Sequence, residues 1–302
     1  MLLYESNDRQ TMKALIFGAD GQDGYYLRKL CEENRIFVQG FALEGSRDCQ
    51  IGDISDFATV ERLVKELQPD YIFHLAAVST TQHEALFKNH AAITTGAINV
   101  LEAVRIHKPS CRVFLAGSGV QFVNTGSPIS EKDLFDVSSA YAVSRIESVY
   151  WARYYRRMGI KAYVGYLFHH ESPLRKPNHL CKKIAELAKR VRDGSSEKIL
   201  LGDLSVKKEA GFAGDIVAGI WTLVNQDDVF EATIGTGKAY SIQEWAEKCF
   251  SKVGSDWRNH VIPRADGFIP EYPLLVSDPM TIFSLGWRPV VDFNALADMM
   301  IT

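Results

Sequence analysis

The sequence predicts an α/β fold built on a doubly wound parallel sheet, and three features of its pattern support this prediction. Short β-branched and aromatic runs alternate with amphipathic helical stretches through the first half of the chain. This alternation is typical of a parallel sheet with helices on both faces. The first apolar run leads directly into a glycine-rich loop, and after residue 168 the alternation weakens while prolines become frequent. We therefore expect a smaller, partly irregular C-terminal region lying over the strand ends.

The elements of the first half follow from local periodicity. Continuous apolar runs of strand length predict buried strands at 13–18, 36–42, 71–75, 112–116 and 161–168. Apolar residues at helical spacing predict helices at 24–34, 57–67, 93–106 and 140–157. Each predicted helix lies between two predicted strands, so each connection can cross over one face of the sheet.

Composition narrows the class of protein. A net charge of −3 over 302 residues gives no reason to expect a nucleic-acid partner. The longest apolar runs are shorter than the roughly 18 residues of a membrane span, and residues 1–11 lack the apolar core of a signal peptide. Five scattered cysteines without CxxC spacing predict neither disulfides nor a metal site. We expect a cytoplasmic protein with no membrane partner, in which residues 1–11 are an extension without chemistry.

The glycine-rich loop, Gly18-Ala-Asp-Gly21-Gln-Asp-Gly24, predicts a Rossmann-type dinucleotide site. Glycines at this spacing allow a tight turn and close approach of the backbone to a pyrophosphate, which then lies at the N-terminus of the helix. A loop with three turn glycines is the alternative, but the order strand, loop, helix favours a cofactor. We expect NADP or NAD to bind here through Gly18, Asp20, Gly21, Gln22, Asp23 and Gly24.

The GxxGxxG spacing resembles that of the extended short-chain dehydrogenase/reductase superfamily, and three further segments agree in order. They are Gly52-Asp53-Ile54, Leu75-Ala76-Ala77-Val78 and Asn99-Val-Leu-Glu-Ala. The resemblance implies that Asp53 and Ile54 lie at the adenine, and that Leu75, Ala76, Ala77 and Leu167 line the cofactor site. Taken singly, Asp53 is equally a helix cap and Asn99 a helix-surface residue. Glu44 could bind a ribose diol and Arg47 a 2′-phosphate, so NAD and NADP both stay open.

A second segment of the superfamily pattern is Tyr141-Ala-Val-Ser-Arg145 on a predicted helix, where Tyr141 and Arg145 project from one face. In the superfamily this is Tyr-x-x-x-Lys, in which the tyrosine exchanges a proton with the substrate and the cation holds the nicotinamide ribose. Arg145 keeps the positive charge but is planar and bulkier than lysine. Ser118, at the end of the preceding strand, is the expected third catalytic residue.

The resemblance narrows further to the GDP-mannose 4,6-dehydratases, over nearly the whole chain from Met12 onward. The segments that carry it are Gly21-Gln-Asp-Gly24-Tyr-Tyr-Leu, Leu167-Phe-His-His-Glu-Ser-Pro173, Leu201-Gly-Asp-Leu204, Glu209-Ala-Gly-Phe-Ala-Gly-Asp215, the segment from Glu271 to Asp278-Pro279, and Leu285-Gly-Trp287, although no site role is expected for Glu271. The most specific is Phe-His-His-Glu-Ser-Pro, where the family has Asn in place of His169. The resemblance implies a GDP-linked sugar as substrate, bound by the 169–302 region, and a nucleotide cofactor bound mainly by 12–168, with some later segments returning to the sheet. The implied substrate-binding residues are Ser79, His169, His170, Glu171, Arg175 and Lys183, with Lys182 a further candidate at the diphosphate.

One departure from the family bears on the reaction. The family's Ser-Thr-Ser-Glu-Leu-Tyr is here Gly117-Ser118-Gly-Val120-Gln-Phe, which keeps a hydroxyl but puts Val120 at the position of the glutamate that removes the C5 proton. General acid–base catalysis contributes about 10²–10⁴ in rate, so its loss is serious for an elimination. A Ser-Gly pair here is similar to that of 4-keto reductases, which need no C5 base.

Three functions remain open. The first, slightly favoured, is an oxidoreductase that moves a hydride between nicotinamide and C4 of a GDP-sugar. The second is a GDP-mannose 4,6-dehydratase whose acid/base is a Gln121-bound water, Glu131 or His169. The third is an inactive cofactor-binding protein with a regulatory or scaffold role. Superfamily analogy predicts a homodimer or homotetramer.

Overall fold

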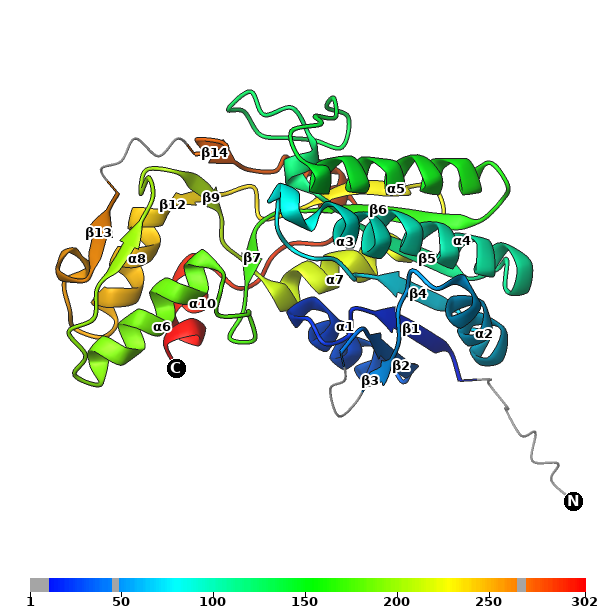
Figure 1. The fold of residues 1–302 in the computed structure, drawn as a ribbon, viewed down its shortest axis with the longest axis horizontal. Coiled ribbons are helices and arrows are strands. Elements are labelled where there is room, and N and C mark those ends of the chain that lie inside the picture. Colours follow the sequence, from blue (N-terminus) through cyan, green and yellow to red (C-terminus); the bar gives the residue numbers. More distant parts are fainter. Residues whose placement is uncertain (1–10, 45–48, 265–269) are drawn as a thin grey trace, which may run out of the picture.

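A seven-stranded parallel sheet forms the centre of the fold in this computed structural model, which describes residues 11–44, 49–264 and 270–302 (Figure 1). Residues 1–10 of the expected extension, and Arg47, lie outside the described residues. The strand order is β11-β6-β5-β4-β1-β2-β3. Their bounds are β1 (Lys13–Phe17), β2 (Phe37–Ala42), β3 (Cys49–Ile51), β4 (Tyr71–His74), β5 (Arg112–Ser118), β6 (Lys161–Leu167) and β11 (Glu231–Ile234). The predicted α/β fold with a doubly wound parallel sheet is confirmed.

Helices cover both faces of this sheet, as the alternation of side chains along β1 shows. Ala14 and Ile16 pack into one core, whose helices are α1 (Gln22–Glu33) and α7 (Ala213–Val224). Leu15 and Phe17 pack into the opposite core. Its helices are α2 (Phe57–Leu67), α4 (Gly96–His107) and α5 (Ala140–Arg156). Successive residues of a strand point to opposite faces, so an unbroken apolar strand fills two cores at once.

Two details differ from the predicted elements. The predicted helix at 93–106 is α4 preceded by a π-helical segment, His90–Thr95, and by the short helix α3 (Leu86–Asn89). A π-helical segment has wider turns than an α-helix, and hydrophobic periodicity does not reveal it. Strand β3 was not predicted, because its three residues are too few and too exposed to give a strand pattern.

A third core lies beside the carboxyl ends of the strands, on the left of Figure 1. It is formed by α6 (Leu180–Arg192), α8 (Ile242–Ser251) and α10 (Phe293–Ile301). The short strands of this region form three small sheets, which are β7 (His170–Glu171) with β10 (Gly211–Phe212), β8 (Ile199–Leu201) with β13 (Val261–Pro263), and β9 (Lys207–Glu209) with β12 (Ala239–Ser241) and β14 (Leu274–Leu275). Helix α9 (Met280–Ser284) packs against β11. Within the described ranges, none of the helices is long and apolar enough to cross a membrane.

Candidate active site

A cavity of about 480 Å³ opens where the carboxyl ends of β4, β5 and β6 face the third core. This is the edge at which open parallel sheets bind their ligands. Its walls come from both parts of the chain, with Leu75, Ser118 and Leu167 on one side and Lys208 and Glu271 on the other. A second hollow of about 600 Å³, lined by residues of β12, α8 and α10, contains none of the predicted site residues.

The glycine loop has the geometry of a phosphate cradle. Gly18 has φ +82°, and a Cβ there would lie 2.8 Å from the backbone N of Ala76. A Cβ at Gly24 would lie 2.6 Å from the Cα of Ala19, so only glycine lets α1 pack this closely. Gly21, by contrast, is the N-cap of α1 and has room for a side chain, its nearest neighbour being the carbonyl oxygen of Gly18 at 3.4 Å. No side chain of the described residues caps α1 here, which leaves its first N–H groups for an anion.

Of the other residues expected at the cofactor, some line the cavity and others lie outside it. Leu75 and Leu167 line the cavity, whereas Ala76 and Ala77 do not. Asn99 donates from Nδ2 to the carbonyl of Ile54 at 2.9 Å, so this buried amide holds the turn that carries Asp53. The Asp53 carboxylate accepts a 2.8 Å hydrogen bond from the N–H of Ser55. The expected contacts of Asp53 and Ile54 with adenine stay predictions.

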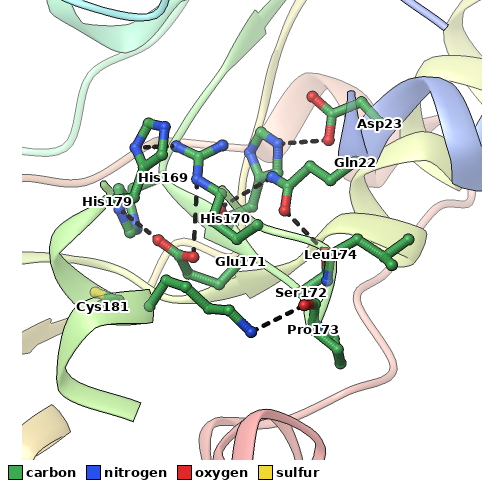
Figure 2. Close-up of polar contacts among 12 residues, drawn as sticks. Gln22, Asp23, His169, His170, Glu171, Ser172, Pro173, Leu174, His179 and Cys181 are labelled. Atoms are coloured by element: carbon green, nitrogen blue, oxygen red, sulfur yellow. Dashed lines mark hydrogen bonds and ion pairs between the residues drawn. The ribbon is translucent and has the colours of Figure 1, made fainter. Parts of the chain in front are cut away.

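Gln22 and Asp23 use their side chains to fasten the segment after β6 (Figure 2). Gln22 accepts a 2.9 Å hydrogen bond from the hydroxyl of Ser172, and Asp23 Oδ1 lies 2.9 Å from Nε2 of His170. Burial lowers the pKa of His170, but the Asp23 carboxylate outweighs it and the net shift is upward. Burial raises the pKa of Asp23, yet the nearby His170 holds it below its usual value. This contact joins the glycine loop to the substrate side of the cavity.

The three predicted catalytic residues meet in the cavity wall. Arg145 is buried and donates from Nε to the Tyr141 hydroxyl oxygen at 3.1 Å, and from Nη1 to the carbonyl of Ala116. A hydrogen bond from a permanent cation stabilises negative charge on the phenol oxygen. Ser118 ends β5 and caps the next turn, its Oγ lying 3.5 Å from the N–H of Val120. The arrangement can therefore bind a carbonyl or hydroxyl oxygen and exchange a proton with it.

The dehydratase alternatives differ in position. Val120 lines the cavity, so an apolar side chain stands where the family has glutamate. Gln121 is fully buried, and its Oε1 accepts a 2.9 Å bond from the N–H of Ser118. Glu131 accepts a 2.6 Å bond from the hydroxyl of Thr281 and does not line the cavity. Of the three candidates, only His169 lines the cavity.

Some of the residues expected to bind the substrate line the cavity, and others do not. Ser79, His169, His170 and Arg175 line the cavity. Lys183 is exposed and outside it. Lys182 is buried but donates to the carbonyl of Pro173 at 2.9 Å and pairs with Glu186 at 2.8 Å, so it supports α6.

Sequence reasoning missed other cavity residues. Lys208, His179 and Glu271 all line it. Burial raises the pKa of the Glu271 carboxyl and, together with the charge of Arg175, lowers that of His179 to about 4. Lys208 precedes Glu209 on β9, and its place directly before the family segment that begins at Glu209 is a signal that could have drawn attention to it.

Glu171 lies behind the cavity wall and is completely buried. Its Oε1 is 3.2 Å from Nε2 of His169, and its Oε2 is 3.8 Å from Nε of Arg175. His169 also places Nδ1 3.0 Å from the carbonyl of Glu209. Burial, with the charge of Lys208, lowers the pKa of His169 to about 4.

Comparisons with known proteins agree with the motifs. The family model described as GDP-mannose 4,6 dehydratase matches residues 15–300. GDP-mannose 4,6 dehydratase 1 of Arabidopsis thaliana is 30% identical over 318 residues, covering 95% of this chain and 88% of that protein. The human GDP-mannose 4,6 dehydratase is 26% identical over 273 residues, covering 80% and 72%.

Two solved structures show the same fold. The UDP-glucose 4-epimerase of Thermus thermophilus in complex with NAD has a TM-score of 0.82 at 20% identity, over 96% of this chain and 98% of that one. The dTDP-glucose 4,6-dehydratase of Bacillus anthracis in complex with NAD has a TM-score of 0.81 at 16% identity, over 96% of each. These likenesses concern the fold alone. The family match, however, covers nearly the whole sequence and confirms the resemblance inferred from the motifs: the chain belongs to the GDP-mannose 4,6-dehydratase family.

Proposed function

We propose that the protein is an NAD(P)-dependent oxidoreductase that transfers a hydride between a nicotinamide cofactor and C4 of a GDP-linked sugar. The observation that carries the proposal is the composition of the cavity wall. Ser118, Tyr141 and Arg145 meet there, while Val120 takes the place of the family's C5 base. Hydride transfer at C4 needs a polarised oxygen and a proton carrier, and both are present.

The nucleotide cofactor fits the glycine loop because Gly21 leaves space at the uncapped start of α1. When bound, its nicotinamide supplies the hydride for reduction of a carbonyl. Ser118 donates a hydrogen bond to the C4 oxygen. Tyr141 gives its proton to that oxygen as the hydroxyl forms, and the Arg145 guanidinium stabilises the phenolate left behind. Solvent then returns a proton to Tyr141.

The substrate side of the cavity suits a diphosphate. Arg175 and Lys208 line it, and His179 lies beside Arg175, with its Nδ1 3.0 Å from an Nη of that guanidinium. Cations facing one cavity attract an anionic nucleotide sugar, and a guanidinium matches the geometry of phosphate oxygens. The guanosine specificity rests on family membership, since the relatives' names specify GDP-mannose.

A 4,6-dehydratase is the second candidate, and Glu271 favours it. This carboxyl lines the same cavity, and partial burial shifts its pKa upward, the direction that favours a proton-carrying role. Glu271 is on the segment before β14, across the cavity from β5, so it would act from a different direction than the family's glutamate.

Mass spectrometry of two reactions separates these candidates. With a GDP-4-keto-sugar and reduced cofactor, we expect a gain of two hydrogens together with loss of the reduced nicotinamide absorbance. With GDP-mannose and catalytic cofactor, we expect no efficient formation of the 4-keto-6-deoxy sugar. Loss of one water from GDP-mannose, without net cofactor consumption, would instead support the 4,6-dehydratase function. Absence of turnover in both reactions, with cofactor bound tightly, would favour the scaffold function.

A further inference from the structure

We infer that His169, Glu171 and Cys181 form a binding site for a zinc ion behind the wall of the cavity. One ligand atom from each residue lies within 4.8 Å of the others. Glu171 is 0% exposed and Cys181 3% exposed, so the site is closed on its inner side. His169 lines the cavity and gives the site an outlet. No CxxC or comparable spacing reveals this site in the sequence, because the site includes a single cysteine and its three residues come from the segment between β6 and β7, from β7 and from α6.

The first argument is the Glu171 carboxylate itself. Both of its oxygens are buried, and neither accepts a hydrogen bond from any residue that the structure describes. A buried carboxylate without donors is costly, and native structures pair such groups with cations or metals. Figure 2 shows this carboxylate among His169, His179 and Cys181.

The second argument is the orientation of His169. Its Nδ1 lies 3.0 Å from the backbone carbonyl of Glu209, a contact that requires a proton on Nδ1. The other ring nitrogen, Nε2, faces Glu171 Oε1, 3.2 Å away. With its proton on Nδ1, the ring can offer Nε2 as a ligand on the side of the carboxylate. A ring N–H donated to a backbone carbonyl is also how histidine ligands of metals are commonly held.

The third argument is the match to zinc. Zinc takes imidazole nitrogen, carboxylate oxygen and thiolate sulfur together, at about 2.0–2.3 Å in a tetrahedral arrangement. Two ligands about 2.0 Å from a tetrahedral ion are about 3.3 Å apart, close to the observed 3.2 Å between His169 and Glu171. The Cys181 Sγ lies within 4.8 Å of both other ligand atoms. Three protein ligands leave a fourth position for solvent.

Arg175 and Lys208 are positive charges that oppose a cation here, and Arg175 is the one in contact with the Glu171 carboxylate. Its Nε lies 3.8 Å from Glu171 Oε2 without a hydrogen bond, and one of its Nη atoms lies 3.0 Å from Nδ1 of His179. A guanidinium at this distance weakens metal binding by repulsion. This gives the site a distinctive prediction: removing the charge of Arg175 should strengthen zinc binding, although it removes an ion pair from Glu171.

The test is metal binding by the full-length protein, stripped with a chelator and titrated with Co²⁺ and then Zn²⁺. We expect one equivalent of Co²⁺ to give a thiolate-to-cobalt absorption band that Zn²⁺ displaces. Cys181→Ser should abolish the band, and Cys181→Ser and His169→Asn should each lower the affinity by about 100-fold or more, above the loss typical of outer-shell changes. Cys49→Ser is the matched control, since Cys49 is the partly exposed cysteine among the five, and it should leave the band unchanged.

Circular dichroism and cofactor-induced stabilisation would verify that the variants fold. Arg175→Gln should bind Zn²⁺ more tightly than the parent. The inference is overturned if the folded parent binds no stoichiometric metal, if Cys181→Ser keeps the band, or if Arg175→Gln binds more weakly. These readouts need no substrate, so they are independent of the proposed reaction.

Discussion

Arg145 shows how an arginine can occupy a position where the superfamily has lysine. The planar guanidinium reaches two acceptors at once, the Tyr141 hydroxyl and the carbonyl of Ala116 at the end of β5. The central carbon of the guanidinium, Cζ, also lies 5.1 Å from the centre of the Tyr141 ring. The residue is therefore packed in place as well as charged, and it orients the phenol relative to Ser118.

This geometry leads to a prediction for the dyad. Tyr141→Phe should lower turnover by about 10²–10⁴-fold, the usual contribution of a positioned proton carrier. Arg145→Met should lose most activity, whereas Arg145→Lys should keep or raise it, because an ammonium also reaches the phenol oxygen. Steady-state kinetics with cofactor affinity measured in parallel is the check. Full activity in Tyr141→Phe would remove the dyad from the mechanism.

A second prediction at this scale concerns His74, at the end of β4. Its Nε2 contacts the carbonyl of Ile93 at 3.2 Å, and burial, reinforced by the charge of Arg145, lowers its pKa from 6.5 to about 4. Between pH 6.5 and about pH 4, the imidazole of His74 is therefore protonated in the unfolded chain but neutral in the folded protein. Stability from this residue is present above pH 6.5 and is lost as the pH falls toward 4.

The loss amounts to about 3.5 kcal/mol at most, since each pKa unit corresponds to about 1.4 kcal/mol. His74→Gln places an amide N–H at the position of Nε2, so it can still donate to the carbonyl of Ile93, but it does not titrate. Urea unfolding of both proteins from pH 7.5 to 4.5 should therefore show a shallower decline for the variant. Parallel curves would mean that His74 has the same pKa in the folded and the unfolded protein.

Two substitutions in the glycine loop distinguish its role in cofactor binding from its role in the stability of the fold. Gly21→Leu should leave the folded protein intact, since a Cβ there meets nothing nearer than 3.4 Å, but its side chain would occupy the pyrophosphate position. Stabilisation by saturating cofactor, about 2.7 kcal/mol at 100 times the dissociation constant, should disappear. Thermal unfolding with and without NAD and NADP measures it.

Gly24→Ala is the contrasting control. Its Cβ would lie 2.6 Å from backbone atoms of Gly18 and Ala19, so α1 must move and stability should fall by about 1–3 kcal/mol. Equal cofactor stabilisation of Gly21→Leu and the parent would place the cofactor elsewhere.

The same elements show what the sequence could and could not predict. The strands β1 and β4–β6 were predictable because each is a continuous apolar run, and Tyr141, Arg145 and Ser118 because they lie at fixed positions relative to those strands. The cavity wall formed by Lys208, His179 and Glu271 was not, because these residues come together only through packing of the third core. Lys183 lies exposed and outside the cavity wall, which the periodicity of α6 did not show, and its expected contact with the substrate stays a prediction.

At the scale of the whole molecule, α5 presents a row of exposed aromatic side chains. Tyr150 is 58% exposed and Tyr154 is 52% exposed, with Trp151 between them. Exposed aromatic clusters are typical of protein interfaces. We predict that the protein forms at least a homodimer through α5, and that Tyr150→Glu with Tyr154→Glu yields a monomer. Light scattering after size-exclusion chromatography measures the mass, and a monomeric parent would contradict the prediction.

If this protein moves a hydride at C4 of a GDP-sugar without expelling water, a nicotinamide cofactor that carries deuterium at its transferable position should label C4 when it reduces a GDP-4-keto-sugar. We expect one deuterium at C4 of the product, seen by mass spectrometry and proton NMR, and at least about 100-fold slower labelling with Tyr141→Phe. A product without deuterium, or conversion of GDP-mannose with loss of water under the same conditions, would contradict this prediction.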